Sequence, residues 1–201
     1  GNAGTTATIE SLEVQSSYEA QLSVDNNEAS DFTITGDVNL TAGDDFADLH
    51  IDDNSSTNVS VSVGGTVNLI SCESDAHVYI DNNITLVDLA GDTSTTNILI
   101  ELGDIDIDGY GLAEVHIENN DDNNDDPEFD IILGNVNLSS HQDANVGIET
   151  NDAVNIEIGN VVMASGDDDA TVSIDYNEGR FYETIVQGDT RYTIDFSEIK
   201  L

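Results

Sequence analysis

The chain has almost no basic residues. It carries 3 Lys+Arg against 42 Asp+Glu, which gives a formal net charge of −39 over 201 residues. A surface this acidic cannot neutralise phosphate groups, so direct binding to DNA, RNA or anionic lipid is excluded. Long hydrophobic runs are also missing, since no stretch approaches the ~18 apolar residues of a membrane span. The sequence therefore predicts no nucleic-acid partner and no membrane insertion.

Cysteine, proline and tryptophan are nearly absent, with 1 Cys, 1 Pro and no Trp. The lone Cys72 excludes an internal disulfide, and a single cysteine is more typical of a small core side chain than of a nucleophile. Disorder is the usual expectation for a very acidic chain, but 38% of the residues are hydrophobic and Val, Ile and Leu recur regularly. We therefore expect a folded domain that buries a sizeable core.

An eight-residue pattern, A-x-[LV]-x-[IV]-[DE]-x-N, occurs six times. Its copies span 20–27, 47–54, 76–83, 113–120, 144–151 and 170–177. A second, glycine-led element precedes each copy after the first by 10 or 11 residues, at 36–40, 65–69, 103–107, 134–138 and 159–163. Residues 11–14 (SLEV) are a divergent copy of this element. Two elements repeated at a nearly fixed offset indicate a repeat architecture.

Apolar residues alternate within each element, which is typical of β-strands, and no segment carries a helical stripe. A third strand lies between the two elements at 59–63, 98–102, 129–133 and 154–158. Such units cannot bury their own apolar face, but parallel stacking produces a continuous core. The sequence therefore predicts an all-β fold, a parallel β-helix (solenoid) of about six rungs over residues 1–179. The alternative, a β-sandwich, explains the alternation but not the repeat. The longest unit contains an additional stretch at 84–96, expected as a loop or an added strand.

The last part of the chain differs from the rest. All three cations, Arg180, Arg191 and Lys200, lie in residues 180–201 together with several aromatic residues. Residues 181–186 and 191–196 flank a turn-forming stretch at 187–190, which predicts a hairpin. Solenoids need terminal caps, so we expect 180–201 to be a C-terminal cap, or else a junction to a further domain beyond the chain end.

Stacking turns each repeat position into a column of residues, in which the first, third and fifth positions face inward and the second, fourth and sixth face outward. The sixth position is acidic in every copy: Asp25, Asp52, Asp81, Glu118, Glu149 and Asp175. Carboxylates about 4.8 Å apart repel one another. They either bind calcium between rungs or form a solvated corner that keeps the protein soluble, and the second interpretation is slightly favoured. The acidic loop 118–130, with Asp121, Asp122, Asp125 and Asp126, is a second candidate calcium site.

The eighth position is asparagine in every copy: Asn27, Asn54, Asn83, Asn120, Asn151 and Asn177. Asparagine tolerates the left-handed backbone conformation of a corner, and stacked side-chain amides bond from rung to rung. We expect both roles at this position. Such Asn ladders resemble those of known parallel β-helix proteins, a likeness of architecture that implies no activity.

Other candidate sites are weaker. His50 and His116 share one outward position, with Tyr79 between them and His77 nearby, which is more typical of isolated surface histidines than of a transition-metal site. Residues 103–109 (GDIDIDG) resemble the start of a calcium loop, but Val115 stands where that loop needs Glu, so a strand is favoured.

No arrangement of nucleophile and base, and no phosphate-binding glycine loop, is present to support catalysis. We therefore expect a non-catalytic module, secreted or at the cell surface, structural or adhesive, from a marine or salt-adapted microbe. Its expected partner is a surface glycan or protein, and calcium is the only expected cofactor. The alternatives are a glycan-binding or glycan-processing β-helix protein and an acidic DNA-mimic inhibitor.

Overall fold

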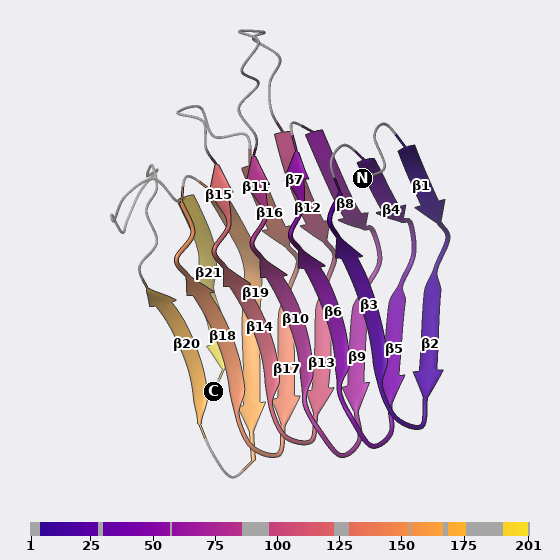
Figure 1. The fold of residues 1–201 in the computed structure, drawn as a ribbon. Coiled ribbons are helices and arrows are strands. Elements are labelled where there is room, and N and C mark those ends of the chain that lie inside the picture. Colours follow the sequence, from indigo (N-terminus) through magenta and orange to yellow (C-terminus); the bar gives the residue numbers. More distant parts are fainter. Residues whose placement is uncertain are drawn as a thin grey trace, which may run out of the picture.

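The computed structural model describes residues 5–27, 30–56, 58–85, 97–122, 129–152, 154–166, 169–175 and 191–200. All regular structure in these ranges is β-strand, and the strands coil into a parallel β-solenoid of about five turns (Figure 1). The predicted fold class is confirmed. The turn count is slightly below the predicted six rungs, because six strands stacked on one face enclose five turns. No helix in these ranges is long and apolar enough to cross a membrane.

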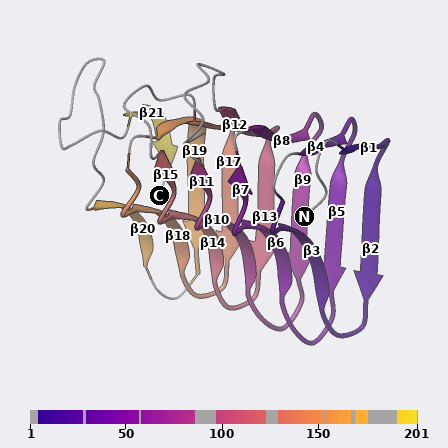
Figure 2. The ribbon, with the colours of Figure 1, turned by 45° about the horizontal axis from the view of Figure 1, so that its top comes forward.

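Each turn of the chain visits three faces in the same order, so strands far apart in sequence lie side by side (Figures 1 and 2). The first face contains β1 (Thr5–Ile9), β4 (Ser30–Ile34), β8 (Asn58–Val63), β12 (Asn97–Leu102), β16 (Phe129–Leu133), the start of β19 (Asn155–Ser165) and β21 (Arg191–Lys200). The second face contains β2 (Leu12–Ser16), β5 (Val38–Ala42), β9 (Val67–Ser71), β13 (Ile105–Gly109), β17 (Val136–Ser140) and the end of β19.

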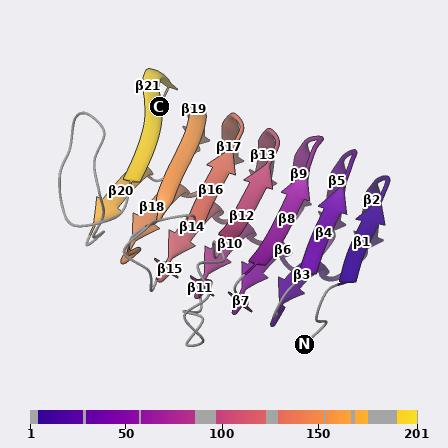
Figure 3. The ribbon, with the colours of Figure 1, turned by 90° about the horizontal axis from the view of Figure 1, so that it is seen from above.

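The third face is formed by one strand from each copy of the eight-residue pattern. It contains β3 (Ala20–Asp25), β6 (Ala47–Asp52), β10 (Ala76–Asp81), β14 (Ala113–Glu118), β18 (Ala144–Glu149) and β20 (Ala170–Asp175). A small fourth ladder follows it, formed by β7 (Ser55–Ser56), β11 (Ile84–Thr85) and β15 (Asp121–Asp122). All the pairings between these strands are parallel, and Figure 3 shows the resulting row of turns from above.

The repeat positions align without any shift on the third face. Ala47 pairs with Ala20 on one side and with Ala76 on the other, and the same register continues to β20. On β14, Ala113, Val115 and Ile117 are fully buried, as the alternation predicts. A one-residue slip would turn these side chains to solvent, so the buried pattern fixes the register. The divergent element 11–14 is confirmed too, because β2 pairs with β5 in register.

The corner between the first and second faces is formed by glycine because neighbouring turns approach closely there. A Cβ atom added at Gly36 would lie 2.6 Å from the carbonyl oxygen of Glu10 on the preceding turn. At Gly134 it would lie 2.7 Å from the carbonyl carbon of Gly103. Both distances are too short for a real Cβ, which explains why the second element begins with glycine.

The Asn ladder, which we define as Asn27, Asn54, Asn83, Asn120 and Asn151, runs along the corner after the third face. Asn54 donates its side-chain amide to Asn83 Oδ1 at 2.8 Å and to the carbonyl oxygen of Val24 at 3.0 Å. Asn83 repeats this geometry toward Asn120 and Ile51. Asn54, Asn83, Asn120 and Asn151 are 0–1% exposed. The predicted ladder is confirmed, and its hydrogen bonds allow amides to be buried here. Asn177 lies outside the described residues.

The left-handed corner residue is not the eighth position, so that expectation was wrong by one residue. Positive φ occurs at the seventh position, with values of 52–55° at Asn26, Asp53, Asn82, Asn119 and Thr150. The chain reverses direction at this residue, which leaves the following asparagine free to point into the corner and bond along the stack. The seventh position therefore makes the turn, and the eighth position forms the ladder.

Four further expectations concern residues that the structure describes in whole or in part. Residues 105–109 form strand β13, so the strand interpretation of GDIDIDG is confirmed. Cys72 is exposed in a turn, so its expected burial was wrong. In the stretch 84–96 the structure describes only Ile84–Thr85, as β11. Residues 181–186 of the predicted hairpin lie outside the described residues, while β21 runs parallel to β19 and adds a strand to the first face.

Candidate functional site

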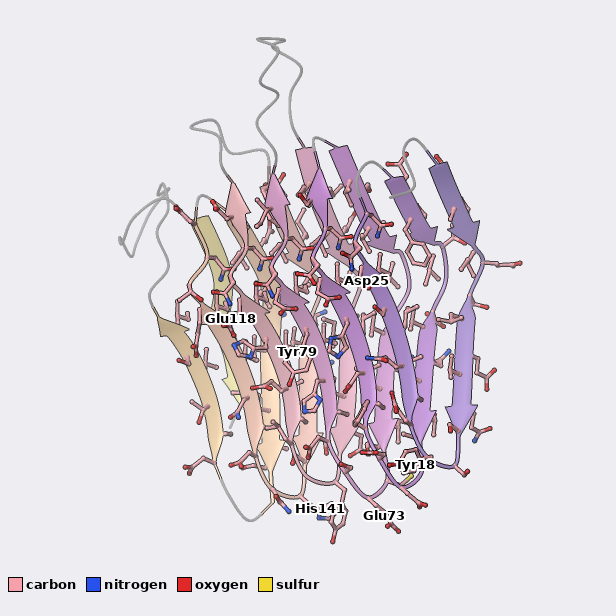
Figure 4. All side chains as sticks on the ribbon, viewed as in Figure 1. Tyr18, Asp25, Glu73, Tyr79, Glu118 and His141 are labelled. Carbon is pink, nitrogen blue, oxygen red and sulfur yellow. The ribbon has the colours of Figure 1, made fainter. Side chains whose placement is uncertain are left out.

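The third face carries the acidic residues singled out by the repeat. The acidic column, Asp25, Asp52, Asp81, Glu118, Glu149 and Asp175, is brought into register by the strand pairing, each residue opposite the next. Figure 4 labels two of its members, Asp25 on β3 and Glu118 on β14, with β6 and β10 between them. Asp25 is exposed, and the next four side chains are half-buried. The six residues of the predicted column are therefore aligned, one on each of six strands that lie about 4.8 Å apart.

Amides from the seventh position satisfy part of this column. Asn26 donates to Asp25 at 3.1 Å, and Asn82 donates to Asp81 at 2.9 Å. Asn119 donates to Glu118 at 2.6 Å in the same way. The residue that makes the left-handed turn therefore also supplies a hydrogen-bond donor to the carboxylate before it, which reduces the cost of packing like charges.

Asp52 and Asp81 are two residues of the column whose carboxyl pKa values are raised. Burial raises the pKa of the Asp52 carboxyl, and the charge of Asp81 raises it further. Burial also raises the pKa of Asp81, which the charge of His50 partly opposes. Oδ1 of Asp52 is buried and has no hydrogen-bond partner among the described residues. This oxygen is the point of the column where a proton or a cation would relieve the most unfavourable charge.

A cluster of histidines lies beside the column, whereas the sequence predicted isolated surface histidines. His50 and His77 share one carboxylate partner, Asp48. Asp48 is only 5% exposed, and its carboxylate lies 2.8 Å from Nδ1 of His77 and 3.5 Å from Nε2 of His50. Burial opposes ionisation of Asp48, but hydrogen bonds from His50 and His77 outweigh it and hold the Asp48 pKa below its usual range. The hydrogen bond to Asp48 raises the pKa of His50, and burial only partly offsets it.

Tyr79 fills the space between the histidines (Figure 4). Its ring centroid lies 5.0 Å from that of His50, 5.1 Å from that of His77 and 6.1 Å from that of His116. Its hydroxyl donates to Glu114 at 3.3 Å, and burial raises its pKa so that it stays protonated. The tyrosine ring therefore separates His50 from His116, as its place between them in the repeat suggested.

Among the described residues, the ion pairs all join a histidine to a carboxylate, and His116 contributes one to Glu118 at 3.3 Å. Histidine is thus the partner of the paired carboxylates on this face. The signal was present in the sequence, because Asp48 and His77 occupy the second position of consecutive copies. Neither Asp nor His recurs at this position in the other copies, so the repeat pattern did not mark the pair.

A hollow lies next to the histidine cluster, on the turn whose fourth repeat position is Gly147. It has a volume of about 320 Å³ and is lined by Glu114, His116, Asp143, Asn145, Glu149 and Asp169, among others. A Cβ at Gly147 would lie 3.1 Å from the ring of His116, so glycine lets this ring lie over the strand. Glu149 is the column residue that borders this hollow.

The second predicted calcium site is only partly described. Asp121 and Asp122 form β15 and pair with β11, while Asp125 and Asp126 lie outside the described residues. In the described part of the chain, no three or more His, Cys, Asp or Glu side chains are grouped as the ligands of one metal ion. A cation on the acidic column would therefore be held by two carboxylates, with water completing its coordination.

Comparison of this chain with protein-family models, curated proteins and solved structures finds no match. Its function must therefore be argued from the geometry of the three faces. That geometry offers a regular, rigid, acidic surface with a histidine cluster that is paired internally.

Proposed function

We propose that this chain is a non-catalytic β-solenoid module, secreted or at the cell surface, with a structural or adhesive role. The observation that supports it best is the in-register stack itself. Every turn adds one more residue to each straight column, and the buried Asn ladder fixes the spacing. A surface of this kind presents the same chemical groups repeatedly along one axis, which suits multivalent attachment through many weak contacts.

The side chains of the histidine cluster are hydrogen-bonded to one another, which argues against catalysis. A general acid or base must be free to reach substrate, and its pKa is usually shifted for that task. Here Asp48, His50 and His77 use their polar atoms on one another, and Tyr79 is occupied by Glu114. These contacts tie adjacent rungs together, so we assign the cluster a structural role.

The acidic surface supports an extracellular and salt-exposed setting. A formal charge of −39 keeps a rod of this kind soluble and opposes side-by-side association. At about 1 M salt the Debye length is about 3 Å, which is shorter than the roughly 4.8 Å between neighbouring strands, so the repulsion between column carboxylates is screened. Calcium, abundant outside cells, would stabilise the column further by bridging neighbouring carboxylates such as those of Asp52 and Asp81.

Retention on arrayed surfaces tests this proposal. The protein is labelled with a fluorophore through Lys200, the only lysine in the chain, and applied to printed glycans, extracellular proteins and nucleases. We expect retention on a subset of spots with no release of cleaved product. Release of sugar fragments would instead make the protein a glycan-processing enzyme. Retention by nucleases, reversed by added DNA, would make it a DNA mimic. No retention on any glycan or protein would contradict an adhesive role.

A further inference from the structure

The second face contains a groove that belongs to neither the acidic column nor the histidine cluster. It has a volume of about 300 Å³ and lies over β9, β13, β17 and the end of β19. Its outward-facing walls are Asn68, Ile70, Asp106, Asp108, Ser139 and Val162, and its floor includes the edges of Leu69, Ile107 and Leu138. The groove is therefore mainly apolar at its base and polar along its sides.

The groove results from a change in side-chain size along two columns. In the first column Asp106 pairs with Asn68 and Asn137, and Asn137 pairs with Val162. In the second column Asp108 lies between Ile70 and Ser139. The short side chains of Asp108 and Ser139 leave a depression next to Ile70, which is 42% exposed and is one of the few large apolar side chains exposed in the described residues.

Two of the amide side chains in the groove are held in place by hydrogen bonds within the protein. Asn137 donates to Asp106 at 2.7 Å, and Asn68 donates to Asn39 at 2.8 Å, so the amides are held in fixed orientations. Asp108 makes no hydrogen bond or ion pair with the described residues, and its carboxylate is exposed. The groove thus presents carboxylate, amide and hydroxyl groups around an aliphatic patch, as small-molecule sites typically do.

We infer that this groove binds a neutral saccharide. The C–H face of a sugar ring packs against Ile70 and Val162, and its hydroxyls bond to Asp108, Ser139 and the Asp106–Asn137 pair. Anionic sugars are excluded by charge, because the ionisable groups lining the groove are both carboxylates and the chain is strongly acidic. This inference rests on the proposed adhesive function and assigns that function a glycan partner and a location.

The experiment is a titration of the ¹⁵N-labelled protein with cellohexaose, xylohexaose and mannohexaose, with a galacturonic acid oligomer as the anionic control. We expect at least one neutral hexasaccharide to shift amide signals of β9, β13 and β17, and the anionic oligomer to shift none. Ile70→Ser and Asp108→Ala should each weaken binding by about tenfold or more. Tyr18→Ser removes another exposed apolar side chain, 60% exposed, outside the groove and should leave binding unchanged.

Several results would overturn the groove as a glycan site. They are shifts confined to other strands, unchanged affinity in both groove variants, stronger binding of the anionic oligomer, or shifts produced only by a cationic peptide such as tetralysine. The array experiment separates this failure from that of the proposed function. If Ile70→Ser is retained on the arrays as well as the unmodified protein, adhesion stands and the groove does not carry it. If neither is retained anywhere, both proposals are wrong.

Discussion

His77 Nδ1 and Asp48 Oδ1 lie 2.8 Å apart on consecutive rungs of the third face. Both residues occupy the second position of the repeat, which faces outward, yet Asp48 is 5% and His77 9% exposed. The neighbouring Tyr79 ring lies against His77 and His50 and closes the cluster from solvent. A hydrogen-bonded His–Asp pair is therefore packed on the outside of the sheet, and it joins two rungs in addition to the backbone ladder.

The cluster predicts that stability falls as the pH rises past about 6.5, the ordinary pKa of histidine. The pKa of His50 is raised by its hydrogen bond to Asp48, so its contribution is complete below about 6.5, the pKa of an unperturbed histidine. It is lost as the pH rises through the higher folded-state pKa. Asp48 has a lowered pKa, so its contribution is present above about 3.9 and is lost only in stronger acid. The raised pKa values of Asp52 and Asp81 also favour the folded state as the pH falls through them.

Thermal melting at pH 6 and pH 8 in buffers of equal ionic strength measures this effect. We expect a higher Tm at pH 6, and a smaller difference between the two pH values in the Asp48→Asn variant. Asp44→Asn is the matched control, because Asp44 is exposed and forms none of the described ion pairs. A pH difference that is the same in Asp48→Asn as in the unmodified protein would show that the cluster does not cause it.

The Asn ladder predicts a large loss of stability when one buried member is removed. Asn83 accepts from both the backbone and the side chain of Asn54, and it donates to Asn120 and to the carbonyl of Ile51. Asn83→Ala leaves several of these buried groups without partners, each of which costs ~1–3 kcal/mol. We expect the free energy of unfolding to fall by about 3 kcal/mol.

Asn68→Ala is the control for this prediction. Asn68 also donates its amide to an asparagine on the preceding turn, Asn39, at 2.8 Å. Both are only partly buried, so water can replace the lost partner, and the loss should stay below about 1 kcal/mol. Urea unfolding of the two variants gives the comparison. Equal losses would mean that burial of the ladder contributes nothing beyond an ordinary surface hydrogen bond.

Thr150 predicts a stabilising substitution. It has a φ of 53°, whereas the other described residues with positive φ at this position are Asn or Asp. A β-branched side chain is poorly tolerated there, and the left-handed conformation costs ordinary residues ~1–2 kcal/mol. Thr150→Asn should therefore raise stability by about 1 kcal/mol, or a Tm gain of about 2–4 °C. Asn119→Thr should lower the Tm by at least as much, because it also removes the amide that donates to Glu118. A fall in the Tm of Thr150→Asn would contradict the argument.

The sequence predicted the architecture well because a stacked repeat makes each position report the same environment several times. Six copies of the pattern with aligned Ala, Val and Ile identify the inward positions, and the pairing of Ala76 with Ala47 and Ala113 confirms them. The left-handed residue was misplaced because Asn82 and Asn83 are adjacent and either could adopt that conformation. Only the direction of the chain at the corner decides between them.

The sites were harder to predict, because they depend on contacts between columns rather than along one. Asp48 and His77 share a column, but their burial depends on the Tyr79 ring in the next column. The groove next to Ile70 arises from the small size of Asp108 and Ser139 on later turns, which no motif marks. The repeat positions show which residues share a column. Where the surface is hollow depends on the relative size of side chains in neighbouring columns.

The final prediction is that calcium stabilises the protein more than ionic strength alone. Asp52 and Asp81 are adjacent in the acidic column, and Oδ1 of Asp52 has no hydrogen-bond partner among the described residues. A ligand that binds only the folded state adds about 2.7 kcal/mol at a hundredfold excess over its Kd. We therefore expect the Tm to rise by several degrees, roughly 5–10 °C at such an excess, in millimolar CaCl₂ relative to NaCl of equal ionic strength.

The double substitution Asp52→Asn with Asp81→Asn distinguishes a bound cation from a repelling, solvated corner. Amides keep the shape of the side chains and remove two charges, and the charge of Asp81 contributes to the raised pKa of Asp52. If calcium binds there, the double variant should lose most of the calcium-dependent gain in Tm. If the column is only a solvated corner, the variant should melt at a higher temperature without calcium and respond to calcium as the unmodified protein does. Identical melting of the unmodified protein in calcium and in matched sodium would reject a calcium site on the column, because an ion that binds the folded state more tightly than the unfolded chain must raise stability.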